Sequence, residues 1–201
     1  MIKAIIFDWG GVMSPQGSPH SFRRLLAASL GTGEDYARSL IRDHVVDLLM
    51  GKITEDQYWR LLEERHGRPI PLSKRNVWLT WDDLKPDPRM LTAVRDLRQR
   101  GYKLGLLSNT TPSFKPELEN HHIPELFDAV VLSCDAHFAK PDPEIYELIC
   151  QKLGAKPAEC LFIDDQQRML DPAAALGLRT ILATGPNQTL GAIEQELIER
   201  P

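Results

Sequence analysis

The sequence predicts an α/β fold, a doubly wound parallel sheet into which a helical segment is inserted. Short apolar runs alternate along the chain with segments that have the spacing of amphipathic helices, which is typical of a parallel sheet with helices on both faces. Between residues 14 and 85 the strand pattern is missing while helix signals continue. We therefore expect an α/β core of residues 1–13 and 86–201, and a helical insertion of residues 14–85.

Five apolar runs are the expected strands. They lack the polar alternation of a half-exposed strand, so each is expected to be buried on both faces of the sheet. The runs are Ile2–Phe7, Leu104–Leu107, Ala129–Leu132, Leu161–Ile163 and Thr180–Ala183.

Four amphipathic segments are the expected helices of the core. Their apolar stripes run through residues 90–97, 145–153, 173–176 and 190–197. Three of these stripes are followed by a glycine, which is typical of a helix C-terminus. These glycines are Gly101, Gly154 and Gly177.

The insertion is expected to consist of helices alone. Residues 34–50 have helical spacing and end before Gly51, which predicts one helix. Thr54 and Gln57 have the spacing of a capping box, so a further helix is expected to begin there and to end at Gly67.

Composition excludes several classes of protein. The chain has 24 Lys and Arg against 28 Asp and Glu, a net charge of −4, whereas nonspecific nucleic-acid binding depends on a basic surface. No apolar run approaches the roughly 20 residues of a membrane-spanning helix, and the start MIKAIIFD lacks the features of a signal peptide. The three cysteines show no CxxC spacing. We therefore expect a reduced, cytoplasmic protein with neither a nucleic acid nor a membrane as partner.

Polar residues follow four of the expected strands, at the edge where parallel sheets bind their ligands. The groups are Asp8-Trp9-Gly10-Gly11, Ser108-Asn109-Thr110, Lys140 and Asp164-Asp165. Each alone has an ordinary structural explanation as a turn former, a helix N-cap or a solvated charge. Together they bring a carboxylate, a hydroxyl, an ammonium group and a carboxylate pair to one edge of the sheet, a combination that chance seldom gives.

This combination indicates phosphoryl transfer. The Ser108 hydroxyl, the Lys140 ammonium group and the loop amides can surround phosphate oxygens. Mg²⁺ prefers a few carboxylates together with water and phosphate oxygens, and Asp8 and Asp165 could supply the carboxylates. The Asp8 carboxylate could then attack phosphorus and form an aspartyl-phosphate, which water would hydrolyse.

The four groups stand in the order found in haloacid dehalogenase-like (HAD) hydrolases. The strings IIFDWGGV and FAKPDPEIY, together with the pairs Ser108-Asn109 and Asp164-Asp165, match the motifs of that superfamily. Over essentially its whole length the chain resembles the group with a helical cap inserted after the first strand. It is similar to sugar-phosphatase-like members and to the N-terminal phosphatase of epoxide hydrolases. The resemblance implies a Rossmann-like core under a helical cap.

The resemblance also implies which residues handle the phosphate. Asp8 is expected to be the nucleophile. Ser108 and Lys140 are expected to bind the transferring phosphate, with the backbone of Asn109 and of Gly10-Gly11 nearby.

A Mg²⁺ site is implied at the same place. Asp8 and Asp165 are expected to contact the metal, and Asp164 is expected to act directly or through water. The Gly10 carbonyl is expected to take the place of the family's backbone ligand.

Two positions depart from the pattern of the family's phosphatases. Gly10 stands where they usually carry a second aspartate as general acid and base, a role worth roughly 10²–10⁴-fold in rate. His20 in the insertion is a conceivable replacement. Met169 stands where close relatives often place an asparagine. We therefore expect a slow enzyme unless another group substitutes.

Two other functions stay open beside the leading one, a Mg²⁺-dependent phosphatase of small phosphorylated metabolites such as sugar phosphates. A 2-haloacid dehalogenase would share the fold and the nucleophile. Dehalogenases are metal-independent, however, and typically lose the acidic pair that Asp164 and Asp165 retain. A non-catalytic binding module would explain Gly10, but clustered carboxylates are unfavourable without a cation to hold them.

Overall fold

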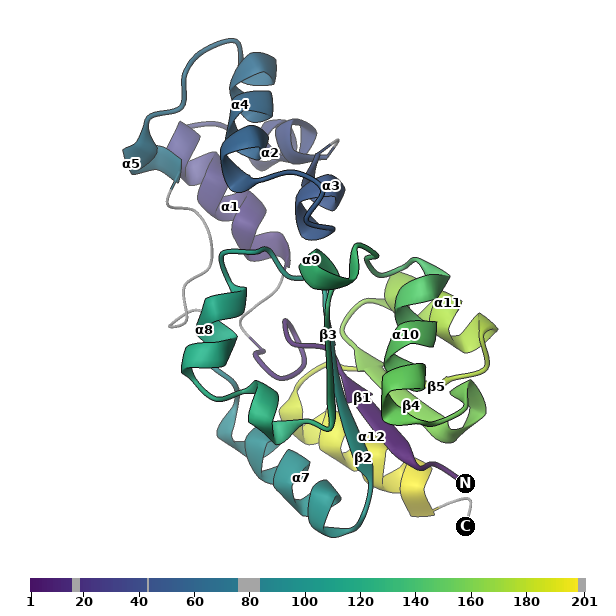
Figure 1. The fold of residues 1–201 in the computed structure, drawn as a ribbon. Coiled ribbons are helices and arrows are strands. Elements are labelled where there is room, and N and C mark those ends of the chain that lie inside the picture. The colour runs from purple at the N-terminus through teal and green to yellow at the C-terminus, as the bar shows by residue number, and fades with distance from the viewer. Residues whose placement is uncertain (16–18, 43, 76–83, 199–201) are drawn as a thin grey trace.

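A five-stranded parallel sheet forms the centre of the molecule, with the strand order β3-β2-β1-β4-β5 (Figure 1). The computed structural model describes residues 1–15, 19–42, 44–75 and 84–198. Its strands are β1 (Ala4–Phe7), β2 (Lys103–Ser108), β3 (Ala129–Leu132), β4 (Cys160–Asp164) and β5 (Arg179–Leu182). The doubly wound parallel fold predicted from the sequence is confirmed, and each strand lies within about two residues of its expected bounds.

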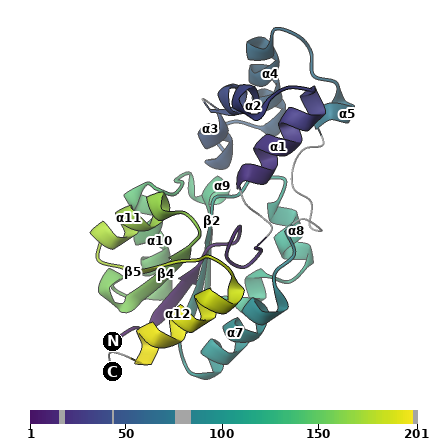
Figure 2. The same cartoon turned by 180° about the vertical axis from the view of Figure 1, so that it is seen from behind.

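The helices of the core cover both faces of the sheet. They are α7 (Pro88–Gln99), α8 (Lys115–Asn120), α9 (Ser133–Ala136), α10 (Pro143–Leu153), α11 (Gln167–Ala175) and α12 (Pro186–Ile198), with 3-10 turns at Pro124–Leu126 and Pro157–Glu159. Helices α7 and α12 pack on one face, and α10 and α11 pack on the other (Figures 1 and 2).

Side-chain alternation in the strands explains these two layers. Ile5 and Phe7 point into the apolar cluster under α7 and α12, whereas Ala4 and Ile6 point into the cluster under α10 and α11. Successive side chains of a strand face opposite sides, so a strand buried on both sides needs an uninterrupted apolar run. The run at the start of the chain meets this need, and β1 therefore lies in the middle of the sheet.

Between β1 and α7, the described residues contain five further helices, which form a helical region. They are α1 (Pro19–Leu30), α2 (Glu34–Ile41), α3 (Val45–Leu49), α4 (Glu55–His66) and α5 (Leu72–Arg75). This region has its own apolar cluster, in which Leu26, Leu40, Tyr58 and Leu62 are completely buried. In the core, the amide of Asp87 donates to the carbonyl of Met13 at 2.8 Å, so the chain segments that enter and leave the region lie side by side. The division of the chain into two domains at residues 14 and 85 stays a prediction.

Two of the three local predictions for the helical region are confirmed, and one is wrong. The capping box is confirmed, because Thr54 accepts from the Gln57 amide and the Gln57 side chain accepts from the Thr54 amide. Gly67 ends α4 in the left-handed conformation, as expected. The single helix expected over residues 34–50 is wrong, because α2 ends at Ile41 and α3 begins at Val45.

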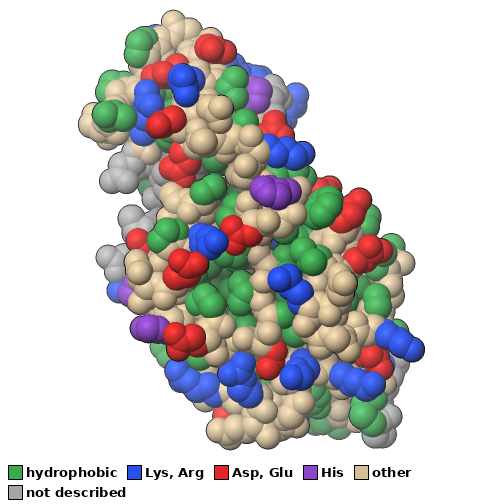
Figure 3. Space-filling model, in the orientation of Figure 1, with side chains coloured by type: hydrophobic (Ala, Val, Ile, Leu, Met, Phe, Trp, Pro, Cys, Tyr) green, Lys and Arg blue, Asp and Glu red, His purple; other side chains and the backbone are tan. Residues whose placement is uncertain are grey.

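The helical region lies beyond the carboxyl ends of the strands, and its contact with the core includes α3 and α9 (Figures 1 and 2). Basic and acidic side chains are both distributed over the face seen in Figure 3. The same view shows that the molecule narrows between the helical region and the core. Among the described residues, no helix combines the length and the apolar character needed to cross a membrane.

Candidate active site

The first site residue follows β1 directly. Asp8 is 6% exposed, and its amide donates to the Ile163 carbonyl at 3.0 Å, which extends the pairing of β1 with β4. Beyond it the chain folds back on itself. The Ser14 amide donates to the Trp9 carbonyl at 2.8 Å, and the Gly11 amide donates to the Ser14 carbonyl at 2.7 Å. The Asp8 carboxylate is therefore fixed at the sheet edge beside a closed loop.

The two glycines of this loop have different reasons to be glycine. Gly11 has a φ of +80°, and a Cβ there would run into the carboxyl group of Asp165. Gly10 forms a β-bridge with Ser14, and as a glycine it offers no side chain for acid-base chemistry. Its carbonyl as a metal ligand stays a prediction. The side chain of His20 lies outside the described part of the chain, so its proposed replacement role stays a prediction as well.

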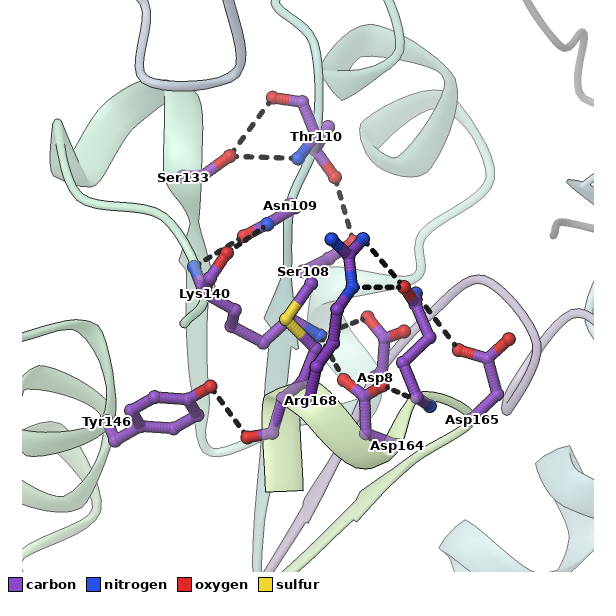
Figure 4. Close-up of polar contacts among 12 residues, drawn as sticks. Asp8, Ser108, Asn109, Thr110, Ser133, Lys140, Tyr146, Asp164, Asp165 and Arg168 are labelled. Carbon is purple, nitrogen blue, oxygen red and sulfur yellow. Dashed lines mark hydrogen bonds and ion pairs between the residues drawn. The ribbon is translucent and has the colours of Figure 1, made fainter. Parts of the chain in front are cut away.

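Lys140 joins the two aspartates that stand at the ends of neighbouring strands. Its Nζ lies 2.8 Å from Asp8 Oδ1 and 2.6 Å from Asp164 Oδ2, and the ammonium group is almost completely buried (Figure 4). Asp8 follows β1, Asp164 ends β4, and Lys140 comes from the loop after α9. Three segments that are far apart in sequence thus converge at the carboxyl edge.

Asn109 holds the backbone of that lysine. Its Oδ1 accepts from the Lys140 amide at 2.8 Å, while its Nδ2 donates to the Lys140 carbonyl at 2.8 Å. The Asn109 side chain is therefore occupied in positioning Lys140, and the expected role of the Asn109 backbone near the phosphate stays a prediction. This pairing fixes the loop across 31 residues of sequence.

Negative charge exceeds positive charge at the centre of the site. Burial raises the pKa of Asp8 to about 7, which Lys140 opposes and the charges of Asp164 and Asp165 reinforce. Burial opposes the charge of Lys140, yet its two carboxylate partners hold its pKa above the usual value. Burial and the charge of Asp164 also raise the pKa of Asp165. The ammonium group of Lys140 thus forms ion pairs with Asp8 and Asp164 and also acts electrostatically on the third carboxylate, Asp165.

The three carboxylates could hold a metal ion. One oxygen each from Asp8, Asp164 and Asp165 can be chosen so that all lie within 4.8 Å of one another. Opposite ligands of an octahedral Mg²⁺ lie about 4.2 Å apart, so a small adjustment brings this cluster to the size of a magnesium site. The surplus negative charge and the hard oxygen donors both fit a divalent cation.

The hydroxyl of Ser108 is buried at the end of β2, the strand next to β1. Ser108 is 4% exposed, and its Oγ accepts from Thr110 Oγ1 at 2.9 Å. Since Thr110 supplies the proton of this hydrogen bond, the hydroxyl proton of Ser108 is free for another acceptor. A phosphate oxygen is an acceptor of that kind.

Gln166 and Arg168, to which no sequence pattern assigns a role, extend the site beyond the acidic pair. The backbone amide of Gln166 donates to Asp164 Oδ1 at 2.9 Å, and its side-chain Nε2 donates to Asp165 Oδ1 at 3.3 Å. Arg168 in turn donates to Gln166 Oε1 through Nε at 3.1 Å and Nη2 at 2.9 Å (Figure 4). Their position directly after the acidic pair was the only signal in the sequence.

Met169, the second position that departs from the pattern of the family's phosphatases, is buried, and its carbonyl accepts from the Tyr146 hydroxyl at 2.8 Å.

Known proteins with similar sequences include several phosphatases. The chain is 29% identical to mouse acyl-CoA dehydrogenase family member 10 over 96% of its own length, but it spans only 19% of that protein. It is 29% identical to a sesquiterpene phosphatase of Aspergillus oryzae, covering 88% of this chain and 87% of the relative. It is 27% identical to a D-ribitol-5-phosphate phosphatase of Bacteroides thetaiotaomicron, covering 90% of this chain and 91% of the relative.

Solved structures with the same fold cover both the sheet and the helical region. A HAD-like family hydrolase from Porphyromonas gingivalis superimposes with a TM-score of 0.77 at 26% identity, over 100% of both chains. A HAD family enzyme from Bacteroides thetaiotaomicron in complex with magnesium and inorganic phosphate shares the fold. Its TM-score is 0.71 at 22% identity, over 92% of this chain and 96% of that one. Residues 2–177 match the sequence profile of the haloacid dehalogenase-like hydrolases, and the chain belongs to that family.

Proposed function

We propose that the protein is a Mg²⁺-dependent phosphatase that hydrolyses a small phosphorylated metabolite through an aspartyl-phosphate on Asp8. The observation that carries this proposal is the bridge of Lys140 between Asp8 and Asp164, 2.8 Å and 2.6 Å long, beside a third carboxylate. Such a centre keeps a carboxylate nucleophile, a cation for the phosphate and ligands for a metal at one point of the sheet edge.

Asp8, Asp165 and the Gly10 carbonyl would hold the Mg²⁺ ion directly. Asp164 would act mainly through water, because one of its oxygens accepts from Lys140 and the other accepts from the Gln166 amide. When bound, the ion would neutralise phosphate charge and so favour attack by an anionic nucleophile.

The reaction would proceed in two displacements at phosphorus. An Asp8 carboxylate oxygen forms a bond to phosphorus while the bond to the alcohol oxygen of the substrate breaks, and water then hydrolyses the aspartyl-phosphate. Lys140 and the Ser108 hydroxyl would stabilise the negative charge on the transferring group. Gly10 supplies no proton, so the departing alkoxide would take its proton from water or from another group.

The substrate class follows from the relatives and from the position of the helical region. We infer that helices α1–α5 act as a cap over the carboxyl edge, which would exclude large phosphorylated partners such as phosphoproteins. Two relatives that align over most of their length are named as phosphatases of small molecules, one of them of a sugar-alcohol phosphate. Sugar and polyol phosphates are therefore the first substrates to examine. The three cysteines are free, in keeping with a cytoplasmic location.

The test is hydrolysis of p-nitrophenyl phosphate by the purified protein, with Mg²⁺ and with EDTA. Asp8→Asn should abolish turnover, and Asp165→Ala should raise the Mg²⁺ concentration needed for it. Asp171→Asn, at an exposed position of α11, serves as the matched control and should retain full activity. Full activity of Asp8→Asn would refute the mechanism.

An inactive wild-type protein would still leave an informative comparison. Gly10→Asp would return the general acid that the family's phosphatases usually carry. Activity that appears only in this variant would make the natural protein a binding module. If the wild type and Gly10→Asp are both inactive on a broad panel of phosphate esters, phosphoryl transfer is ruled out as the function.

A further inference from the structure

Ser133 connects the helical region to the core. It begins α9 directly after β3, it is completely buried, and its Oγ donates to the Leu49 carbonyl at 2.6 Å. Leu49 ends α3, and the next carbonyl, that of Met50, accepts from His137 Nδ1 at 2.9 Å. The turn after α3 is therefore docked on α9 by two hydrogen bonds from side chains to backbone carbonyls.

The same serine also holds the loop after β2. Its Oγ accepts from the Thr110 amide at 2.9 Å, and the Thr110 carbonyl lies 3.4 Å from it. A serine hydroxyl has a single proton, so it can donate strongly to only one carbonyl at a time. With the helical region docked, the shorter contact to Leu49 takes that proton.

Thr110 connects the Ser133 hydrogen bond with Ser108, the last residue of β2. Thr110 is 5% exposed, and its Oγ1 donates to Ser108 Oγ at 2.9 Å (Figure 4). This hydrogen bond fixes the rotation of the Ser108 hydroxyl and leaves the proton of Ser108 for a ligand. Three hydrogen bonds, two of them buried and the one to Leu49 partly buried, thus connect a carbonyl of the helical region with the hydroxyl proposed to bind the phosphate.

We infer that Ser133 is a positioning residue that couples docking of the helical region to the orientation of the Ser108 hydroxyl, through Thr110. The inference rests on the proposed function, in which Ser108 binds the transferring phosphate. In the docked arrangement Ser133 donates to Leu49 and holds the Thr110 amide, and Ser108 is aligned. Loss of the Leu49 contact would free the Ser133 proton for the Thr110 carbonyl, 3.4 Å away, and the alignment would be lost.

The docking contact leaves no room for a side chain at the turn after α3. Gly51 has a φ of +64°, and a Cβ there would run into the carbonyl oxygen of Cys134 in α9. Gly67 in the same region has a φ of +74° with nothing within 4 Å of a Cβ. Alanine imposes the same backbone strain at both positions, but only at Gly51 does it push the helical region off α9.

The first experiment separates positioning from mere stability. Thr110→Val, which keeps shape and loses the hydroxyl, should lower kcat/KM about five- to tenfold, as expected for one hydrogen bond, whereas Thr110→Ser should retain it. Ser133→Ala should have a similar effect. In a Ser108→Ala background both changes should have almost no further effect, because the group through which they act is gone. Thr189→Val removes an equally buried hydroxyl in α12 and should leave kcat/KM unchanged.

The second experiment tests the coupling to the helical region. Gly51→Ala should lower kcat/KM about as much as Ser133→Ala, and Gly67→Ala should not. In the Ser133→Ala background Gly51→Ala should have little further effect. Equal losses in Gly51→Ala and Gly67→Ala would overturn the coupling, and so would effects that multiply fully in the Ser108→Ala background.

Binding of inorganic phosphate in the presence of Mg²⁺, measured by calorimetry, keeps the inference testable apart from turnover. If the wild-type protein binds phosphate without hydrolysing esters, the proposed function fails. The same variants then report the coupling through the dissociation constant for phosphate. A protein that neither hydrolyses esters nor binds phosphate would overturn both proposals.

Discussion

Replacing Asp8 with asparagine should stabilise the metal-free protein at neutral pH while it abolishes activity. Asp8 is almost completely buried, and a single ammonium group, that of Lys140, serves both its carboxylate and that of Asp164. Asparagine has nearly the same shape and carries no charge. The substitution therefore removes a buried negative charge without leaving a cavity.

The size of the effect follows from the pKa of Asp8. Burial raises it from 3.8 to about 7, and each pKa unit corresponds to about 1.4 kcal/mol, so the ionised form destabilises the folded state by about 4 kcal/mol. The sign follows from proton uptake. Between pH 4 and pH 7 the folded protein keeps the proton that the unfolded chain has lost, so wild-type stability falls as the pH rises through this window and is level above it.

Urea unfolding in EDTA at pH 5 and pH 8 measures this difference. The stability advantage of Asp8→Asn over the wild type should grow by about 2–3 kcal/mol between the two pH values. Asp171→Asn, which changes an exposed carboxylate, should show no such growth. Adding Mg²⁺ should stabilise the wild type more than the variant, in proportion to its binding. An Asp8→Asn variant that is less stable than the wild type at pH 8 would refute the reasoning.

Three further changes test other parts of the structure. Gly11→Ala should raise the dissociation constant for Mg²⁺ at least tenfold, measured by calorimetry, because its Cβ displaces Asp165; Gly31→Ala, with a φ of +66° and open space around it, is the control. Thr54→Ala should lower the free energy of unfolding by about 1 kcal/mol in urea titrations through loss of the N-cap, and Thr54→Ser should not. Gly10→Asp should raise turnover of alkyl phosphates by about tenfold or more and change that of p-nitrophenyl phosphate little, because only the poorer leaving group needs a proton; equal gains on both would contradict this.

The sheet was predictable because its signal is local. Parallel strands buried on both faces require apolar runs, and each of these runs overlaps a strand of the sheet. The capping box at Thr54 and Gln57 was predictable for the same reason, since its two hydrogen bonds span three residues. The break between α2 and α3 was not, because Leu40 and Leu48 on either side of it pack into one cluster. A continuous apolar stripe does not reveal a change in the helix axis.

The charged centre of the site was predictable to the extent that strand order determines it. Parallel strands bring their carboxyl ends to one edge, so Asp8 and Asp164 had to lie near each other once β1 and β4 were neighbours. The hydrogen bonds around the centre depend instead on tertiary distances. Ser133 meets a carbonyl 84 residues away, and Asn109 clamps the backbone of Lys140 across 31 residues. Nothing in the local sequence at either position specifies these partners.

The charge balance of the centre bears on whether this hydrolase is active despite Gly10. Three carboxylates around one buried ammonium group destabilise the folded state unless a cation joins them. Most sequence changes at Asp8 or Asp165 would relieve that repulsion, so a protein without need of the site could become more stable by losing it. The chain nevertheless has these carboxylates, although their repulsion destabilises the folded state. It also has the Asn109 clamp on Lys140 and the glycine at position 11 that makes room for Asp165. A site held in an unfavourable ionisation state by this many specific contacts fits a bound metal and a reaction better than it fits a remnant.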